Sequence, residues 1–183
     1  MRIMTEEVRT MGKAQRISIL LFISIAALSM LSGCTSRNDE GFAIYLTRDD
    51  IPPVSMEVLS NIEKSSEPIL TEHDIVSYDA KDHSILLEPD AFLKFNDLEL
   101  STRGKSFLVC VDGFPIYWGA FWTPLSSMSF EGVVIMLPSF AGENIVNISL
   151  GYPGESFYKG SDPRNDKRIL DTLEKAGKLT GKP

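Results

Sequence analysis

Few side chains in this chain carry reactive chemistry. Catalytic thiols, zinc ligands and general bases rely on cysteine and histidine, and the 183 residues contain two of each. Cys110 lies in the apolar run FLVCVD, which is typical of a buried, inert thiol, because a catalytic thiol needs a histidine partner and a positively charged setting. His73 and His83 belong to no catalytic motif. The sequence also has no phosphate-binding glycine loop, zinc spacing or nucleophile elbow. We therefore expect a protein that is not an enzyme and uses no metal or cofactor.

Aromatic side chains are the more distinctive chemical feature. Residues 112–123, DGFPIYWGAFWT, place five rings in twelve positions. Asp112 and Gly113 form a strong turn dipeptide between two β-rich runs, so the rings are expected on the second strand of a hairpin. Gly119 interrupts this strand and marks either a β-bulge or a close approach of another backbone. A bulge would change the face that the later rings occupy. The rings either belong to a sheet core or, in part, line an exposed groove.

The spacing of the rings separates those expected in the core from those expected at the surface. Phe114, Ile116 and Trp118 share one strand face, which predicts that Trp118 is packed in the core. Trp122 follows the glycine and precedes a Thr-Pro pair where the strand must end. It is the best candidate for a partly exposed ring, with Tyr117 second. The candidate binding residues are Tyr117, Trp118, Phe121 and Trp122.

The beginning of the chain has the pattern of an export signal. Residues 17–30, ISILLFISIAALSM, are an unbroken apolar run, shorter than the roughly 20 residues that span a bilayer. Lys13 and Arg16 precede it, as in a secretory signal. The run ends in LSGC at residues 31–34, which resembles the lipobox of bacterial lipoproteins. This resemblance implies that the Cys34 thiol is lipidated, that the signal is cut just before it, and that the protein is lipid-anchored to the extracytoplasmic side of a cell membrane or outer membrane.

Length and charge then limit what the mature chain can be. After a signal peptide at residues 1–33, we expect a lipidated tether at residues 34–41, one domain at residues 42–178 and a short tail at residues 179–183. The formal net charge is −7, and no cluster of Lys and Arg is present. These features argue against nucleic-acid binding and leave acyl chains to hold the protein at the membrane.

The periodicity of apolar residues predicts a single α+β domain with a mostly antiparallel sheet and one or two packing helices. Strands are expected within residues 41–47, 73–88, 106–122, 131–138 and 143–152. Helices are expected at residues 89–100, which Pro89 opens, and at residues 163–177, which Gly177 ends. Residues 54–66 fit either a helix or irregular chain.

Two local patterns refine this outline. In the run FLVCVD both strand faces are apolar, which predicts a central strand covered on both sides, with the helix at residues 89–100 as one cover. Residues 162–166, DPRND, could be mistaken for a cation site. They are better explained as a helix start, with Asp162 as the N-cap and Pro163 in the first helical position.

The order of these segments resembles the extracytoplasmic head region of SecD, the accessory subunit of the Sec protein-translocation machinery. The resemblance covers residues 67–137, through EPILTEHDIVSYDA, HSILLEPDAFLKFNDL and GKSFLVCVDGFPIYWGAF. The matching positions are Pro68, Leu70, Thr71, Asp74, Ile75, Phe92, Phe95, Asp112, Gly113 and Ile116. This chain differs in carrying YWG where the family has a small S-A-P, and in showing no counterpart of the membrane spans of SecD.

The resemblance implies a free-standing, head-like α+β domain on the outer side of a membrane, where the head of that family engages emerging polypeptide. The leading hypothesis is therefore a non-catalytic, membrane-anchored lipoprotein domain that binds polypeptide or an envelope protein partner and does not bind nucleic acid. Two alternatives stay open. One is a lipoprotein that binds a small ligand or envelope component through the aromatic run. The other, less favoured, is a hydrolase built on paired carboxylates.

Overall fold

A computed structural model describes residues 41–181, so the predicted signal peptide and the lipidation of Cys34 lie outside the described residues. The strands are β1 (Phe42–Leu46), β2 (Leu70–Thr71), β3 (Ile75–Asp79), β4 (Ser84–Leu87), β5 (Lys105–Val111), β6 (Phe114–Trp122), β7 (Phe130–Met136), β8 (Ile145–Tyr152) and β9 (Leu179–Thr180). The helices are α3 (Pro89–Asn96) and α4 (Lys167–Lys175), with 3-10 turns η3 (Pro53–Ser55), η4 (Leu59–Asn61), η5 (Glu72–Asp74) and η6 (Glu155–Phe157). The predicted α+β class is confirmed.

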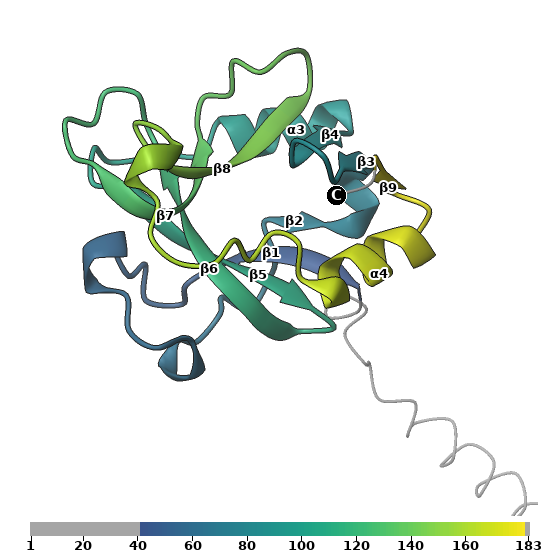
Figure 1. The fold of residues 1–183 in the computed structure, drawn as a ribbon, viewed down its shortest axis with the longest axis horizontal. Helices are drawn as coiled ribbons and strands as arrows, with labels where there is room; N and C mark the ends of the chain where they lie inside the picture. The colour runs from purple at the N-terminus through teal and green to yellow at the C-terminus, as the bar shows by residue number, and fades with distance from the viewer. Residues whose placement is uncertain (1–40, 182–183) are drawn as a thin grey trace, which may run out of the picture. The chain divides into compact units, whose positions relative to one another are not determined.

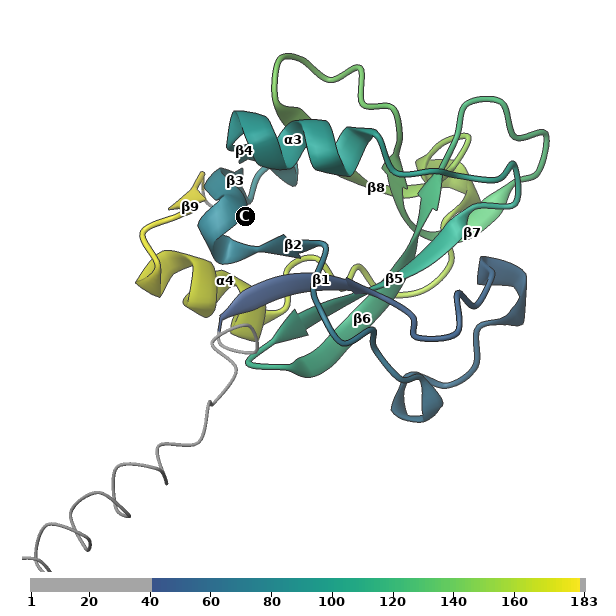
Figure 2. The same cartoon turned by 180° about the vertical axis from the view of Figure 1, so that it is seen from behind.

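The nine described strands form one sheet in the order β2-β1-β5-β6-β7-β8-β4-β3-β9. Neighbouring strands are antiparallel except in the pairs β6–β7 and β3–β9. β2 lies at one edge of the sheet and β3 lies next to the other edge, yet only η5 separates them along the chain. The sheet therefore has to curl until its edges approach each other, and Figures 1 and 2 show this curl from opposite sides.

The main hydrophobic core lies on the inner face of the curled sheet. β5 is buried on both faces, as predicted. Phe107 and Val109 belong to the inner core, whereas Leu108 and Cys110 belong to a second cluster that the connection between β1 and β2 covers. α3 adds Phe95 to the inner core, so this helix covers one side of the sheet, as its apolar spacing indicated.

The hairpin between β5 and β6 has the turn that the sequence predicted. Val111 pairs with Phe114, and the two residues between them have positive φ angles, 50° at Asp112 and 78° at Gly113. This is the type I′ geometry that an Asp-Gly pair favours. The Asp112 carboxylate also accepts a hydrogen bond from the Gly41 backbone N–H at 2.9 Å. Gly41, which the sequence assigned to the tether, is thus attached to the domain.

The C-terminal end of the domain differs from the prediction in two ways. The N-cap of α4 is Asp166, whose side chain accepts a hydrogen bond from the Arg168 N–H at 2.9 Å. The predicted cap, Asp162, instead binds the guanidinium of Arg164. The predicted tail also contains β9, which pairs in parallel with β3, so the domain continues to the end of that strand.

Two other local predictions have simple outcomes. Gly177 has a φ of 70° and follows α4 directly, and the Lys178 N–H bonds the Leu173 carbonyl at 2.8 Å, so the predicted glycine stop is confirmed. The ambiguous residues 54–66 are mostly irregular, with only η3 and η4 as single helical turns.

Candidate functional site

A groove lies where the parallel strands β6 and β7 separate. The two strands pair only from Gly119 and Val133 onward, so residues 114–118 of β6 have β5 as their only neighbouring strand. A cavity of about 700 Å³ occupies this fork. Its lining, which we call the aromatic groove, consists of Leu59, Ile116, Tyr117, Trp118, Ser129, Phe130, Glu131, Gly132, Val133, Tyr158, Lys159 and Pro163.

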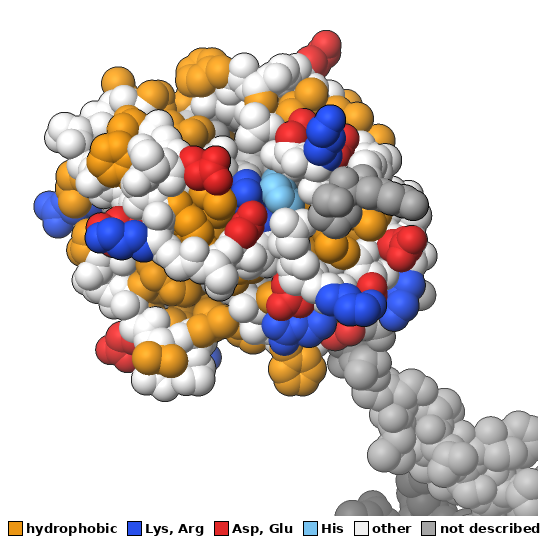
Figure 3. All heavy atoms as spheres, in the orientation of Figure 1, with side chains coloured by type: hydrophobic (Ala, Val, Ile, Leu, Met, Phe, Trp, Pro, Cys, Tyr) orange, Lys and Arg blue, Asp and Glu red, His pale blue; other side chains and the backbone are white. Residues whose placement is uncertain are grey.

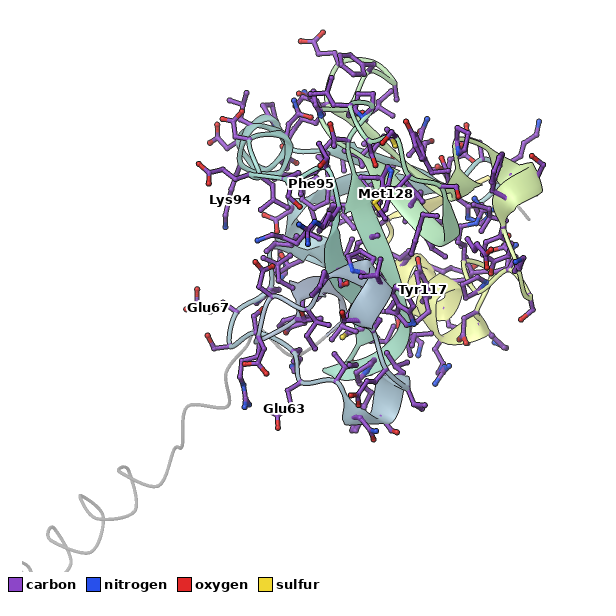
Figure 4. All side chains as sticks on the ribbon, turned by 90° about the vertical axis from the view of Figure 1, so that its left-hand side faces the viewer. Glu63, Glu67, Lys94, Phe95, Tyr117 and Met128 are labelled. Atoms are coloured by element: carbon purple, nitrogen blue, oxygen red, sulfur yellow. The ribbon has the colours of Figure 1, made fainter. Side chains whose placement is uncertain are left out.

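Four rings from three parts of the chain line the aromatic groove. Tyr117 and Trp118 come from β6, Phe130 comes from the start of β7, and Tyr158 follows η6. The rings of Trp118 and Phe130 lie 5.8 Å apart between centroids, at an angle of 59°. Figure 4 labels Tyr117 beside the C-terminal segment, drawn in yellow. Such a surface offers stacking and apolar contact rather than acid or base chemistry.

The faces of the aromatic run are set by a bulge that the sequence prediction misplaced. The β5–β6 register pairs Val109 with Tyr117 and Cys110 with Pro115. Ile116 is therefore the extra residue of a β-bulge. Of the two expectations for Gly119, the bulge is wrong and the close backbone approach is confirmed, because a Cβ there would lie 2.7 Å from the Val133 carbonyl oxygen. Because side chains alternate along a strand, the shift by one residue turns Tyr117 inward and Trp118 outward.

The structure corrects the predicted exposure of both tryptophans. Trp122 is fully buried, and its ring stacks on Phe130 at 5.2 Å, so the expectation that it is the partly exposed ring is wrong. Trp118, predicted as core, is only half-buried and lines the groove. Phe121 is fully buried in the inner core, and Tyr117 retains 7% exposure. Of the four candidate binding residues, the structure therefore brings Tyr117 and Trp118 into one groove and leaves Phe121 and Trp122 in the interior.

Sequence reasoning missed three apolar residues of the groove. Leu59 comes from η4, Phe130 from β7 and Tyr158 from the segment after η6. They are far apart in the sequence and share no periodic pattern. The fork that brings them together depends on the parallel pairing of β6 with β7, which no local signal predicts. The aromatic character of Phe130 and Tyr158, on either side of β8, was the only available hint.

An ion pair lies at the rim of the aromatic groove. The Lys159 ammonium is 2.5 Å from a Glu131 carboxylate oxygen, and the Lys159 N–H donates to the Glu131 carbonyl at 3.0 Å. Both side chains are exposed, so the pair contributes little to stability. Its effect is to join the segment after η6 to β7 along one wall of the groove.

A polar cluster lies outside the lining of the groove. The Tyr78 hydroxyl bonds His83 Nδ1 at 2.8 Å. Arg164 makes three hydrogen bonds to Asp162, one from its backbone N–H and two from its guanidinium, which also donates to the Ile148 carbonyl. Figure 3 shows a histidine, in pale blue, in a hollow beside basic and acidic side chains. Burial raises the pKa of Tyr78 and lowers that of His83. Both groups are neutral near pH 7, and the arrangement is that of a structural network.

Acid pH is expected to destabilise the protein through His83. Burial, and then the Arg164 charge, lower the pKa of His83 in the folded state, so the unfolded chain, with a histidine pKa near 6.5, binds the proton more tightly. The free energy of unfolding should fall as the pH drops below about 6.5, by at most about 1.4 kcal/mol per pH unit from this group, until the folded-state pKa is passed. Urea unfolding of the wild type and of His83→Gln at a series of pH values measures the slope.

The matched control for this experiment is His73→Gln, because His73 is exposed. This variant removes an exposed imidazole, whereas His83→Gln should lose the part of the slope that lies between about pH 5 and 6.5. Carboxylates dominate the pH dependence only below that range. A slope that persists unchanged in His83→Gln would contradict the assignment.

No family model, no curated protein and no solved structure matches the chain. Within residues 41–181, no three His, Cys, Asp or Glu side chains are grouped as metal ligands, and neither described helix has the length and apolar character needed to cross a bilayer. The aromatic groove is therefore the feature of the described residues on which a functional proposal can rest.

Proposed function

We propose that this chain is a membrane-anchored extracytoplasmic lipoprotein whose non-catalytic, SecD-head-like domain binds a polypeptide segment of a partner in the aromatic groove. The observation that carries the proposal is the groove in the fork between β6 and β7, where four rings surround a cavity of about 700 Å³. Aromatic residues, tryptophan and tyrosine above all, supply much of the binding energy at protein interfaces. Trp118, Phe130 and Tyr158 are half-buried, Tyr117 is buried, and all four rings are in place before any partner arrives.

The volume of the groove also favours a second candidate function. Sites for small molecules usually enclose about 300–1,000 Å³ and are mostly apolar with a few polar groups. The aromatic groove lies within that range, so a small ligand or envelope component held by stacking is the alternative. The two functions differ in whether an unfolded polypeptide competes for the site.

Truncation of Trp118 tests the groove. Trp118→Ala is expected to weaken the binding of a fluorescent, reduced and alkylated unfolded protein at least tenfold, because the ring is a wall of the groove. Fluorescence anisotropy with the full chain in mild detergent measures the dissociation constant. Phe140→Ala is the matched control, since Phe140 is an exposed ring that lies outside both the groove lining and strand β6. Equal losses in both variants, or no binding by the wild type, would count against the polypeptide proposal.

The proposed membrane location of the protein depends on lipidation of Cys34. The lipobox resemblance leads us to expect that Cys34→Ala accumulates as an uncleaved precursor and takes up no fatty acid. Growth with a clickable palmitate analogue, followed by gel fluorescence, measures the incorporation. Cys110→Ala is the control, because Cys110 is buried in β5 and should have no influence on labelling. Undiminished labelling of Cys34→Ala would remove the lipoprotein assignment and leave the groove proposal standing.

A further inference from the structure

We infer that the partner segment, whose binding rests on the proposed function, adds to the sheet as an extra β-strand along the open edge of β6. The inference concerns the mode of binding and the chemistry of the partner: an extended polypeptide segment that is uncharged and apolar on both of its faces. Three features of the aromatic groove support it.

The first feature is the open edge itself. Residues 114–118 of β6 pair with β5 on one side, and pairing with β7 begins only at Gly119. In a strand with one neighbour, alternate residues direct their N–H and C=O groups to the empty side. Pro115 fits such an edge, because proline inside a sheet is confined to edge strands and bulges. The open edge spans roughly 17 Å at about 3.4 Å per residue.

The second feature is that one backbone acceptor of the opposite strand, β7, is already used. The Glu131 carbonyl of β7 accepts the Lys159 N–H at 3.0 Å, and the Lys159 side chain pairs with the Glu131 carboxylate. The β7 side thus offers one backbone acceptor fewer to an incoming strand, whereas no backbone bond of the described residues outside the β5 pairing uses residues 114–118 of β6. Only a polypeptide backbone supplies donors and acceptors that repeat every two residues at the spacing of a strand. A sugar, a lipid or a planar small ligand lacks this repeat.

The third feature is the apolar character on both sides of the open edge. Trp118, Phe130 and Leu59 gather on the outer side, where Trp118 packs with the outer cluster. Tyr117 belongs to the inner core and has Tyr158 as a groove neighbour. Successive side chains of an added strand point alternately to these two sides. Both sets therefore meet aromatic side chains, with the Glu131–Lys159 ion pair at the rim. This surface favours runs of consecutive apolar residues, as unfolded chains expose, over alternating amphipathic strands.

N-methylated peptides test this mode of binding. The probe is an acetylated, amidated, fluorescent heptapeptide with a Val-Phe-Val centre between Thr and Lys residues, titrated into the full chain in mild detergent. One N-methyl group is placed on each central residue in turn. Alternate positions should lose at least tenfold in affinity, because their N–H groups face β6, and the positions between them should change less than about threefold. Amide hydrogen exchange at residues 116–118 should slow in the complex.

The outcomes separate the inference from the proposed function. The alternating pattern together with slower exchange supports strand addition. Equal affinities for all N-methylated peptides, or failure of the heptapeptide while the unfolded protein still binds, overturns strand addition and leaves the proposed function in place. Failure of both the heptapeptide and the unfolded protein to bind removes the proposed function and the inference with it.

Replacing Val-Phe-Val by Asp-Phe-Asp in the probe should abolish binding. Retention of affinity by this acidic peptide would overturn the stated preference for apolar segments.

Discussion

Replacing Trp122 with alanine is expected to lower the free energy of unfolding by about 3–5 kcal/mol, the usual cost of removing a buried aromatic ring. The side chain is fully buried, stacks on Phe130 with an interplanar angle of 19° and lies 6.0 Å from the Tyr152 ring centroid. Gly104 leaves room for it, because a Cβ there would lie 2.5 Å from the indole. A typical domain is held by roughly 5–15 kcal/mol, so this variant should be barely folded at 37 °C. Urea unfolding measures the loss.

Two control variants separate ring packing from other effects of the change at Trp122. Trp122→Phe should cost much less than the alanine variant, since a ring remains and the indole Nε1, which is buried without a hydrogen-bond partner in the described structure, is removed together with its desolvation cost. Phe114→Ala should stay within about 0.5 kcal/mol of the wild type, because Phe114 is 73% exposed. A loss at Trp122→Ala no larger than at Phe114→Ala would show that Trp122 does not pack against Phe130 and Tyr152 as described.

The second large effect is expected at Gly119, where the fork between β6 and β7 closes. A Cβ at this position would lie 2.4 Å from Cζ of the buried Phe107 and 2.7 Å from the Val133 carbonyl oxygen. Val133 is the β7 residue that pairs with Gly119, so even one methyl group has to move either a packed ring or the neighbouring strand. Gly119→Ala should therefore lower the free energy of unfolding by about 1–3 kcal/mol, the range typical of overpacking.

Gly154→Ala provides the matched control for Gly119→Ala. A Cβ at Gly154 meets nothing within 4 Å, and the residue has an extended backbone that other residues adopt. The variant should be neutral, or more stable by up to about 1 kcal/mol through reduced freedom of the unfolded chain. Thermal unfolding of both variants side by side checks the contrast. Similar melting temperatures for the two would mean that β6 and β7 are not in close contact at Gly119.

These two predictions also bear on the groove, because the residues that they change lie at its closed end. Trp122 and Gly119 lie on the part of β6 that pairs with β7, and Trp118 lies on the part that does not. Variants at the closed end should change stability first and binding only through the loss of folded protein. Variants at Trp118 should weaken binding first and change stability less. One aromatic strand thus serves the core along one half and lines the groove proposed to bind polypeptide along the other.

The sequence alone determined the features whose causes are local. The Asp112-Gly113 turn, the Pro89 helix start and the glycine stop after α4 each depend on the backbone preferences of one or two residues, and each was predicted correctly. The two apolar faces of β5 were also predictable, because a strand covered on both sides has to be apolar at consecutive positions. From these elements the α+β class follows.

Tertiary structure decided which rings are accessible. A bulge at Ile116 rather than at Gly119 moves every later side chain to the opposite face, since the side-chain period of a strand is two. Trp122 is buried because Phe130 and Tyr152 arrive from β7 and β8, and Trp118 stays half-exposed because β7 has not yet joined β6 at that point. The groove exists only where two strands from separate parts of the chain diverge. The pairing of those strands is set by the packing of the whole curled sheet, and local preferences along the chain carry no information about it.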